Sequence, residues 1–292
     1  MPRVAILGNE GSWYVGDLLR AAVELRVEAE RIEFTKLVAQ VNSAAMVRYE
    51  QRNIAEYDAV IVRTMPPGSL EQVVFRMDVL LQLEQQGVAV LNPARSLECA
   101  VDKYLTTARL ATAGLPVPET IVCEGEEEAL VALNQLGGDV VVKPLFGAEG
   151  RGIVRVSDPD LGLRTFRTLS RLQAVLYLQR FIDHPGYDIR VLVLDGEIVG
   201  SIKRHNPHDF RTNLARNGVG EMHSLTDQEA HLARQAVQVS GARCAGVDLL
   251  YDKSGQCYVI EVNAVPGWRG FAKITGIDVA RRLLQAALMP VT

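Results

Sequence analysis

Long apolar segments are missing from this sequence of 292 residues. No apolar stretch reaches the ~18 residues that are needed to cross a bilayer. The first β-like run, Val4–Leu7, is too short for the core of a signal peptide. The sequence therefore predicts a cytoplasmic protein that is neither exported nor held in a membrane.

Paired cysteines and runs of like charge are missing as well. The four cysteines, Cys99, Cys123, Cys244 and Cys257, form no C-x-x-C pair, so neither a disulfide framework nor a structural zinc site is implied. The 31 basic and 35 acidic residues give a net charge of −4 and are spread along the chain. Because no basic stretch stands out, we expect no nucleic-acid or membrane partner.

The N-terminal third alternates short β-like runs with helical patterns, as βαβ units do. The β-like runs are Val4–Leu7, Ile32–Phe34, Ala59–Arg63 and Ala89–Leu91, and the helical patterns are Asp17–Glu30 and Ser69–Gln86. This alternation is typical of a parallel sheet. It predicts an N-terminal α/β domain over residues 1–95.

The organisation changes after this domain. A predicted helix, Leu97–Ala113, is followed by Pro116 and Pro118, which break the pattern as a linker would. Strand and helix patterns around a glycine-rich loop then indicate a compact α+β unit. We expect a second domain over residues 96–182.

Residues 183–292 are predicted to form a third domain. Two hairpins dominate it, and a last helix, Ile277–Leu288, closes the chain. Side chains alternate between the two faces of a strand, so the polar residues of each hairpin can share one face. The predicted fold class is thus α/β followed by α+β.

The hairpin Gly246–Asn263 carries the most informative polar residues. If its loop is Lys253–Gln256, Asp248 lies opposite Glu261, and Asn263 falls on the same face. Two carboxylates and an amide are ligands that Mg²⁺ prefers. Apolar side chains are expected on the opposite face: Val247, Leu249, Ile260 and Val262. The alternative is an ordinary solvated sheet face.

The segment Val140–Gly152 joins a β-like run, which ends in Lys143, to three glycines, Gly147, Gly150 and Gly152. Glycine lets backbone N–H groups close around an anion, and a lysine adds a positive charge. No Gly-Lys-Ser/Thr follows, so this is not the P-loop pattern. We expect a phosphate-binding loop, with a plain glycine-rich hairpin as the alternative.

The other hairpin, Tyr187–Arg204, has an Asp-Gly turn that predicts a tight register. This register places Asp188 opposite Lys203 and Arg190 opposite Ser201. The other face is expected to be apolar and core-facing: Ile189, Val191, Val193, Ile198 and Ile202. Such a polar face suits a triphosphate and a ribose, whereas a surface salt bridge is the alternative.

A polar segment, Asp209–Gly220, follows this hairpin. It is too long and too rich in hydrogen-bond donors for a simple turn, and polar loops of this kind often carry function. Its Arg211, Asn213 and Arg216 could hold phosphate or a substrate carboxylate.

In this order, the motifs resemble the ATP-grasp superfamily, and in particular the RimK-like family of α-L-glutamate ligases. The matching motifs are Asp102-Lys103, the Lys143 strand with its glycine loop, Gln179-Arg-Phe-Ile182, Asp188-Ile-Arg190, Asp209-Phe-Arg-Thr-Asn213, Gly246-Val-Asp248 and Glu261-Val-Asn-Ala-Val-Pro-Gly267. The resemblance implies an ATP-grasp fold that follows an N-terminal parallel-sheet domain.

The resemblance also implies two cofactors, ATP and Mg²⁺ or Mn²⁺. The implied ATP-binding residues are Lys103, Lys143, Gly147, Gly150, Gly152, Gln179, Arg180, Phe181, Ile182, Asp188, Lys203, Arg211, Thr212 and Asn213, and the implied metal ligands are Asp248, Glu261 and Asn263. Arg180 and Phe181 would flank adenine. The implied catalytic residues are Lys143, Arg190 and Arg211, which suit the electrostatics of phosphoryl transfer.

In the family that these motifs resemble, a substrate carboxylate takes the γ-phosphate, and an amine, commonly that of glutamate, attacks the acyl phosphate. Pro266–Phe271 looks similar to members that add L-glutamate to tetrahydromethanopterin-type pterins. Trp268 could stack on a flat ring and Arg269 could hold its carboxylate, with Arg216 as a further substrate residue. Core packing is the alternative for Trp268. We expect L-glutamate and a small carboxylate acceptor as substrates.

Two alternatives stay open at this stage. The acceptor could be a ribosomal-protein C-terminus or an amino-group carrier protein. A catalytically silent nucleotide-binding regulator would share the fold, but it should have lost a metal ligand or a phosphate-binding lysine, and all of these are present. The sequence also leaves open the number of residues added and the oligomeric state, with a homo-oligomer among the options.

Overall fold

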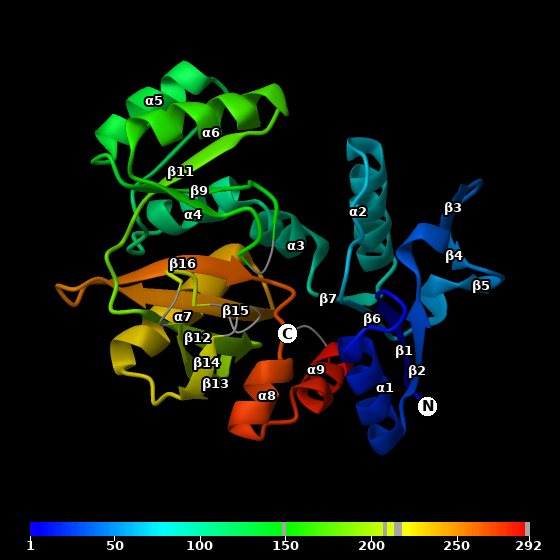
Figure 1. The fold of residues 1–292 in the computed structure, drawn as a ribbon. Helices are drawn as coiled ribbons and strands as arrows, with labels where there is room; N and C mark the ends of the chain where they lie inside the picture. Colours follow the sequence, from blue (N-terminus) through cyan, green and yellow to red (C-terminus); the bar gives the residue numbers. More distant parts are fainter. Residues whose placement is uncertain (148–149, 207–208, 213–217, 290–292) are drawn as a thin grey trace.

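The computed structural model describes residues 1–147, 150–206, 209–212 and 218–289 and contains three lobes (Figure 1). Each lobe is built on one main sheet, which we call the N-terminal, middle and C-terminal sheet. In the described part of the chain, no helix is long and apolar enough to cross a membrane.

The N-terminal sheet has the order β2-β1-β6-β7, and all of its strand pairs are parallel. Its elements are β1 (Arg3–Leu7), α1 (Trp13–Leu25), β2 (Glu28–Ile32), β6 (Ala59–Val62), α2 (Leu70–Gln85) and β7 (Ala89–Leu91). Helix α1 packs on one face of the sheet and α2 on the other, in two separate cores. The predicted parallel sheet is confirmed.

Helix α1 differs from its prediction because its end is set by Arg26. This residue takes a left-handed conformation with a φ of 56° and ends the helix. The predicted helix Asp17–Glu30 therefore runs too far, into β2. It also starts later than α1 does. The sequence analysis also missed a small antiparallel sheet of β3 (Leu37–Val41), β4 (Ala45–Tyr49) and β5 (Arg52–Asn53), flanked by short helices η1 (Phe34–Lys36) and η2 (Ile54–Glu56).

The single helix predicted over Leu97–Ala113 is two helices, α3 (Ala94–Val101) and α4 (Lys103–Thr112). The break falls at Asp102, whose backbone is extended and whose side chain accepts a hydrogen bond from the Leu105 N–H at 2.9 Å. An aspartate in this position caps the new helix. The break places Lys103 in the first turn of α4.

The middle sheet has the order β10-β9-β11-β8, with antiparallel neighbours. Its elements are β8 (Thr120–Cys123), α5 (Glu126–Gln135), β9 (Val140–Lys143), β10 (Val154–Val156), α6 (Pro159–Arg171) and β11 (Leu176–Arg180). Helices α5 and α6 cover one face and share a core with the strands (Figure 1). The opposite face is left for the C-terminal lobe.

The C-terminal sheet has the order β14-β13-β12-β15-β16. Its elements are β12 (Tyr187–Leu194), β13 (Glu197–His205), β14 (Val219–Met222), α7 (Asp227–Ser240), β15 (Cys244–Tyr251), β16 (Cys257–Asn263), α8 (Arg269–Thr275) and α9 (Val279–Leu288). Helix α7 packs on one face. Helix α9 packs against α1 and shares a core with the N-terminal lobe.

Candidate active site

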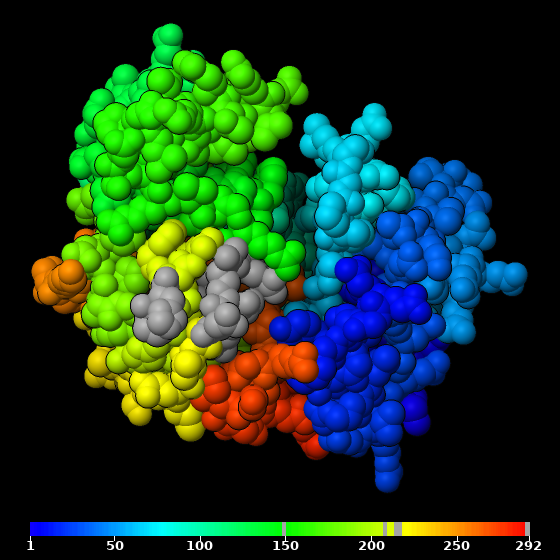
Figure 2. Space-filling view, in the orientation of Figure 1, coloured from blue at the N-terminus to red at the C-terminus, as the bar shows by residue number. Residues whose placement is uncertain are grey.

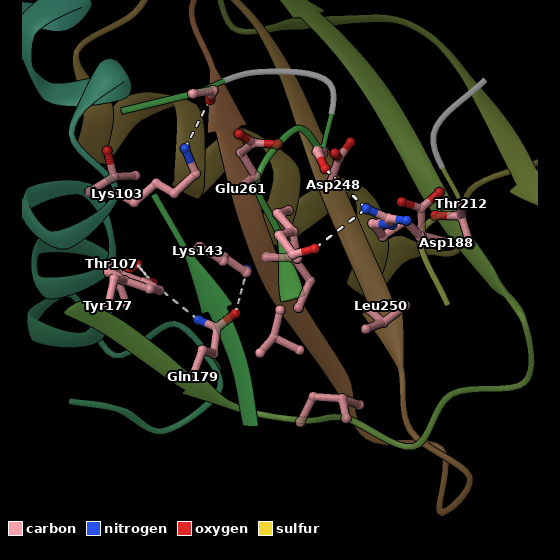
Figure 3. Close-up of a pocket in the computed structure, with 18 of the residues that line it drawn as sticks. Lys103, Thr107, Lys143, Tyr177, Gln179, Asp188, Thr212, Asp248, Leu250 and Glu261 are labelled. Atoms are coloured by element: carbon pink, nitrogen blue, oxygen red, sulfur yellow. Dashed lines mark hydrogen bonds between the residues drawn. The ribbon is translucent and has the colours of Figure 1, made fainter. Parts of the chain in front are cut away.

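A pocket lies between the middle and C-terminal sheets (Figure 3). Many of the residues that were implied to bind ATP or metal line it: Lys103, Lys143, Gly147, Gly150, Gln179, Arg180, Phe181, Ile182, Asp188, Arg211, Thr212, Asp248 and Glu261. Three others, Gly152, Lys203 and Asn263, do not line it, and neither does Arg190, which was implied to be catalytic. Asn213 and Arg216 lie outside the described residues.

Two lysines enter the pocket, Lys143 from β9 of the middle sheet and Lys103 from the first turn of α4. Lys143 ends β9 and donates a 2.6 Å hydrogen bond to Gln179 Oε1, while Lys103 donates to the Gly147 carbonyl at 2.9 Å. Burial lowers the pKa of both side chains, that of Lys143 to about 8, and the nearby Glu261 carboxylate partly opposes this shift. Two partly buried ammonium groups beside an open pocket are suited to a polyanion.

Asp248 and Glu261 lie directly opposite each other on β15 and β16. The predicted pairing is confirmed, but it depends on a β-bulge: the pairs at the hairpin end are shifted by one residue, and Ile260 is the extra one. The bulge turns Ile260 into the pocket, so its predicted place in the core is wrong. Val247, Leu249 and Val262 do lie in the core.

The three candidate metal ligands differ in their present contacts. The carboxylate of Glu261 forms no hydrogen bond or ion pair with the described residues, and Figure 3 shows it between Lys103 and Asp248. Asn263 Oδ1 accepts from the Val265 N–H at 2.9 Å. Glu261 thus presents the uncommitted oxygens of this face.

Asp248 is held by two arginines. Arg190 donates to it through Nε and, at 2.8 Å, through a terminal nitrogen, and Arg204 lies 3.0 Å from its Oδ2. The positive charges outweigh the effect of burial, so they hold the pKa of Asp248 below its usual range. Arg190 therefore holds Asp248 in this structure and does not face the pocket directly.

The predicted register of β12 and β13 is wrong. A bulge shifts the pairing, so Asp188 lies opposite Arg204 instead of Lys203, and Arg190 lies opposite Ile202 instead of Ser201. Ile202 therefore lies on the same face of the sheet as Arg190. It packs in the core that also contains residues of α1 and α9. Lys203 lies opposite the core residue Ile189 and rests on the Tyr187 ring at 3.9 Å.

Arg204 is the site residue that the sequence analysis missed. It is 4% exposed and donates to both carboxylate oxygens of Asp188, one of them at 2.7 Å. Together with its contact to Asp248, it joins two of the predicted site carboxylates. Arg204 follows Lys203 directly in the sequence. It could have been predicted as the partner of Asp188 only if a bulge in the hairpin had been allowed for.

One end of the pocket is apolar and aromatic. Phe181 lines it beside Leu250 and Ile260, with the Arg155 guanidinium 3.5 Å from the Phe181 ring centre. Arg180 forms an ion pair with Glu119 at 3.2 Å. Apolar walls of this kind suit a flat heteroaromatic ring.

Arg211 connects two loops at the pocket. It pairs with Asp209 and directs one terminal nitrogen at the carbonyls of Gly150 and Ile153, both at 3.4 Å. Thr212 beside it is buried and lines the pocket. The glycine loop and the segment after β13 thus meet at one side of the pocket.

Trp268 is fully buried, so the prediction of an exposed stacking surface is wrong. Its indole N–H donates to Asp17 Oδ2 at 2.8 Å, and its ring packs edge-on against Tyr14 with centroids 4.9 Å apart. The alternative of core packing is what the structure shows. Arg269 is exposed, lies 5.5 Å from the Trp13 ring centre, and does not line the pocket.

Known proteins resemble this chain along its whole length. The RimK-like ATP-grasp domain matches residues 100–287, and the RimK pre-ATP-grasp domain matches residues 2–97. The chain is 31% identical over 291 residues to a tetrahydromethanopterin:alpha-L-glutamate ligase of Methanococcus maripaludis, with 98% of each chain covered. It is 33% identical over 288 residues to a ribosomal protein bS6--L-glutamate ligase of Salmonella schwarzengrund, with 97% of this chain and 94% of that protein covered.

Solved structures show the same fold. A RimK domain ATP-grasp protein from Sphaerobacter thermophilus matches with a TM-score of 0.76 at 22% identity, covering 98% of this chain and 100% of its own. The ATP-grasp ligase PsnB, complexed with a minimal precursor, matches with a TM-score of 0.78 at 22% identity and 98% coverage of each chain. The predicted ATP-grasp fold with its N-terminal parallel-sheet domain is confirmed. The chain belongs to the RimK-like family of ATP-grasp ligases, which use ATP to form amide bonds.

Proposed function

We propose that this ligase adds L-glutamate to a small, carboxylate-bearing acceptor of the pterin type. The arrangement that supports ligase chemistry most directly is the pocket in which Lys103 and Lys143 face Glu261 and Asp248. Cations on one wall and carboxylates on the other suit a bound metal–triphosphate. The similarity to ligases named for tetrahydromethanopterin supports the acceptor class.

ATP would lie with its base at the aromatic end of the pocket, beside Phe181 and Ile260, and its phosphates near the two lysines. Partly buried ammonium groups are less screened by water than exposed ones, so they interact more strongly with phosphate oxygens. Arg211, which joins the glycine loop to the segment after β13, would help to close this end. No covalent enzyme intermediate is needed for such a reaction.

The residues present fit a divalent cation. Glu261 offers carboxylate oxygens that the described residues leave unpaired, and Asp248 is fixed beside it by Arg190 and Arg204. Hard, oxygen-only ligands of this kind suit Mg²⁺, and Mn²⁺ accepts the same set. When bound, the cation neutralises charge on the phosphates. A homologous fold, PsnB, has been solved with Mg and ADP.

The reaction has two displacements. An acceptor carboxylate oxygen attacks the γ-phosphorus, the bond to the β–γ bridging oxygen breaks, and ADP leaves. The amine nitrogen of L-glutamate then attacks the acyl carbon, phosphate leaves, and the nitrogen loses a proton to solvent. Lys103 and Lys143 would hold the phosphate charge during the first displacement, and Arg204 would keep Asp188 and Asp248 in place.

The acceptor is tested by a phosphate-release screen. Purified protein receives ATP and Mg²⁺ with each amino acid, crossed with a reduced pterin that carries an acidic tail and with a ribosomal-protein C-terminal peptide. We expect phosphate release with L-glutamate and the pterin. Release with the peptide alone would contradict the small-acceptor proposal and leave the ligase chemistry intact, and release with Mn²⁺ in place of Mg²⁺ would extend the metal set.

A further inference from the structure

Arg63 carries a buried positive charge, and none of the described residues supplies an acidic partner. It follows β6 directly, is 8% exposed, and donates one hydrogen bond, at 3.0 Å, to the Pro266 carbonyl. Its Nε is buried and has no hydrogen-bond partner among the described residues. Burial lowers the pKa of Arg63 to about 10, and no carboxylate offsets this shift.

This arrangement leaves the charge only partly compensated. The guanidinium carbon lies 4.4 Å from the Trp268 ring centre and 5.2 Å from that of Tyr14. Such cation–π contacts offset only part of the cost of desolvating the charge, because a buried charge with no counter-ion is strongly unfavourable. Buried nitrogens without hydrogen bonds are rare in folded proteins. A carboxylate would complete the site.

Arg63 also lies where an open α/β sheet binds ligands. In the order β2-β1-β6-β7, the chain leaves β1 toward β2 on one side and returns to β6 on the other, and α1 and α2 lie on opposite faces. The crevice at the carboxyl ends of two such strands is the usual ligand site. A neighbouring hollow at this edge is lined by residues that follow β1, β2 and β6, among them the carboxylates Glu10 and Glu33, and Arg63 and Tyr14 do not line it.

Tyr14 and Gly267 border the same guanidinium. The Tyr14 hydroxyl forms no hydrogen bond with the described residues, and the side chain is only half-buried. A Cβ at Gly267 would lie 2.6 Å from the hydroxyl oxygen, so only glycine permits this approach. Gly267 is exposed and follows the candidate metal strand by four residues. In Figure 2 a hollow separates the green middle lobe from the cyan region of α2, above the loops of the N-terminal sheet.

We propose that Arg63 and Tyr14 form a subsite for a substrate carboxylate that is not itself phosphorylated. Arginine can donate two parallel N–H groups to a carboxylate, and the phenol can donate a third hydrogen bond. ATP is not the occupant of this subsite, because the pocket assigned to ATP does not include Arg63. The carboxylate belongs to incoming L-glutamate or to the acidic tail of the acceptor. This inference rests on the proposed function.

The test replaces Arg63 by Met, which keeps the length of the side chain and removes the charge. We expect the KM of L-glutamate or of the acceptor to rise about ten- to a hundredfold, the loss of a hydrogen bond to a charged group, with the KM of ATP unchanged. Tyr14→Phe should raise the same KM by a smaller factor. Arg48→Met is the matched control, because Arg48 also has a buried, unpartnered Nε but lies in β4.

Calorimetric titration with L-glutamate, in the presence of a nonhydrolysable ATP analogue, separates binding from turnover. L-Isoglutamine lacks the α-carboxylate and L-glutamine the side-chain carboxylate. The analogue that lacks the carboxylate contacted by Arg63 should bind wild-type protein and Arg63→Met equally weakly. If neither analogue behaves in this way, Arg63 binds the acceptor, and Arg63→Met should then raise the KM of the acceptor.

Equal KM changes for all three substrates, or a fall in kcat alone, would overturn the subsite. Arg63→Met that fails to fold leaves Tyr14→Phe to decide in the same way. A wild-type protein that binds L-glutamate through Arg63 but never consumes ATP would instead overturn the proposed function.

Discussion

Glu261 is the residue on which the candidate metal site depends most. Asp248 is already neutralised by Arg190 and Arg204, whereas the Glu261 carboxylate lies near the two lysines and forms no hydrogen bond or ion pair within the described part of the chain. Sequence alternation alone identified the pair, because opposed residues on an antiparallel hairpin share a face. The same reasoning could not find Arg204, because a bulge moved the register of its strand.

Glu261→Gln should fold normally and lose at least about a hundredfold in kcat, because charge on the transferred phosphoryl group would no longer be neutralised. The assay is ATP turnover at several Mg²⁺ concentrations, with circular dichroism as the fold control. Glu197→Gln, at an exposed hairpin end, should be neutral. Undiminished turnover of the Glu261 variant would refute its role.

Arg204→Met should lower the free energy of unfolding by about 3–5 kcal/mol, the cost of leaving a buried carboxylate unpaired. Asp188 would lose both of its hydrogen bonds from this arginine, while Asp248 would keep Arg190. Urea unfolding measures the change. A loss below about 1 kcal/mol, the value of a surface pair, would show that Asp188 is solvated in the folded protein.

At the scale of elements, helix ends were predicted where capping residues mark them and missed where backbone conformation decides. Ser69 and Gln72 form a capping box at α2, one residue from the predicted start. The left-handed Arg26 gave no comparable signal, whereas the capping aspartate Asp102 was present but lay inside the longer predicted helix. The small sheet β3–β5 was missed because its strands are short and each of β3 and β4 buries only one residue, so they lack a clear apolar alternation.

The start of α7 contains a pH-sensitive contact. Burial acts to raise the pKa of Glu229, but hydrogen bonds from the Thr226 N–H, His223 and Tyr251 outweigh it and lower the pKa below its ordinary 4.5. This stabilisation is therefore present above about pH 4.5 and is lost as the pH falls through the folded-state pKa.

Glu229→Gln should be less stable than wild type at pH 7, and the difference should shrink below pH 4.5. Urea unfolding of both proteins across this range provides the measurement. A difference that stays constant with pH would mean that the charge of Glu229 contributes nothing.

At the scale of the whole molecule, the N-terminal lobe holds the segment that leaves the candidate metal strand. Asn92, Arg63 and Asp17 bind the Ala264 carbonyl, the Pro266 carbonyl and the Trp268 indole in turn. Trp268 is buried because this interface covers it, a tertiary contact that no local pattern in the sequence reveals. The family fold, by contrast, was recognisable because its motifs are local and occur in order.

Asn92→Ala should lower the free energy of unfolding by about 3 kcal/mol or more, because it leaves buried backbone groups without partners. The Asn92 side chain donates to the Cys244 and Ala264 carbonyls and accepts from the N–H groups of Arg243 and Cys244. The thermal unfolding transition should become less cooperative, because Asn92 links the N-terminal lobe to the C-terminal lobe. Asn42→Ala, in an exposed loop, is the control and should change little.

The central claim, an acyl-phosphate route to an amide, is tested most directly by isotope transfer. The acceptor is labelled with ¹⁸O in its reacting carboxylate, and the phosphate and nucleotide products of a complete reaction with ATP and L-glutamate are analysed by mass spectrometry. We predict ADP together with one ¹⁸O atom in phosphate for each amide bond formed. Unlabelled phosphate, or AMP and pyrophosphate in place of ADP, would contradict the mechanism.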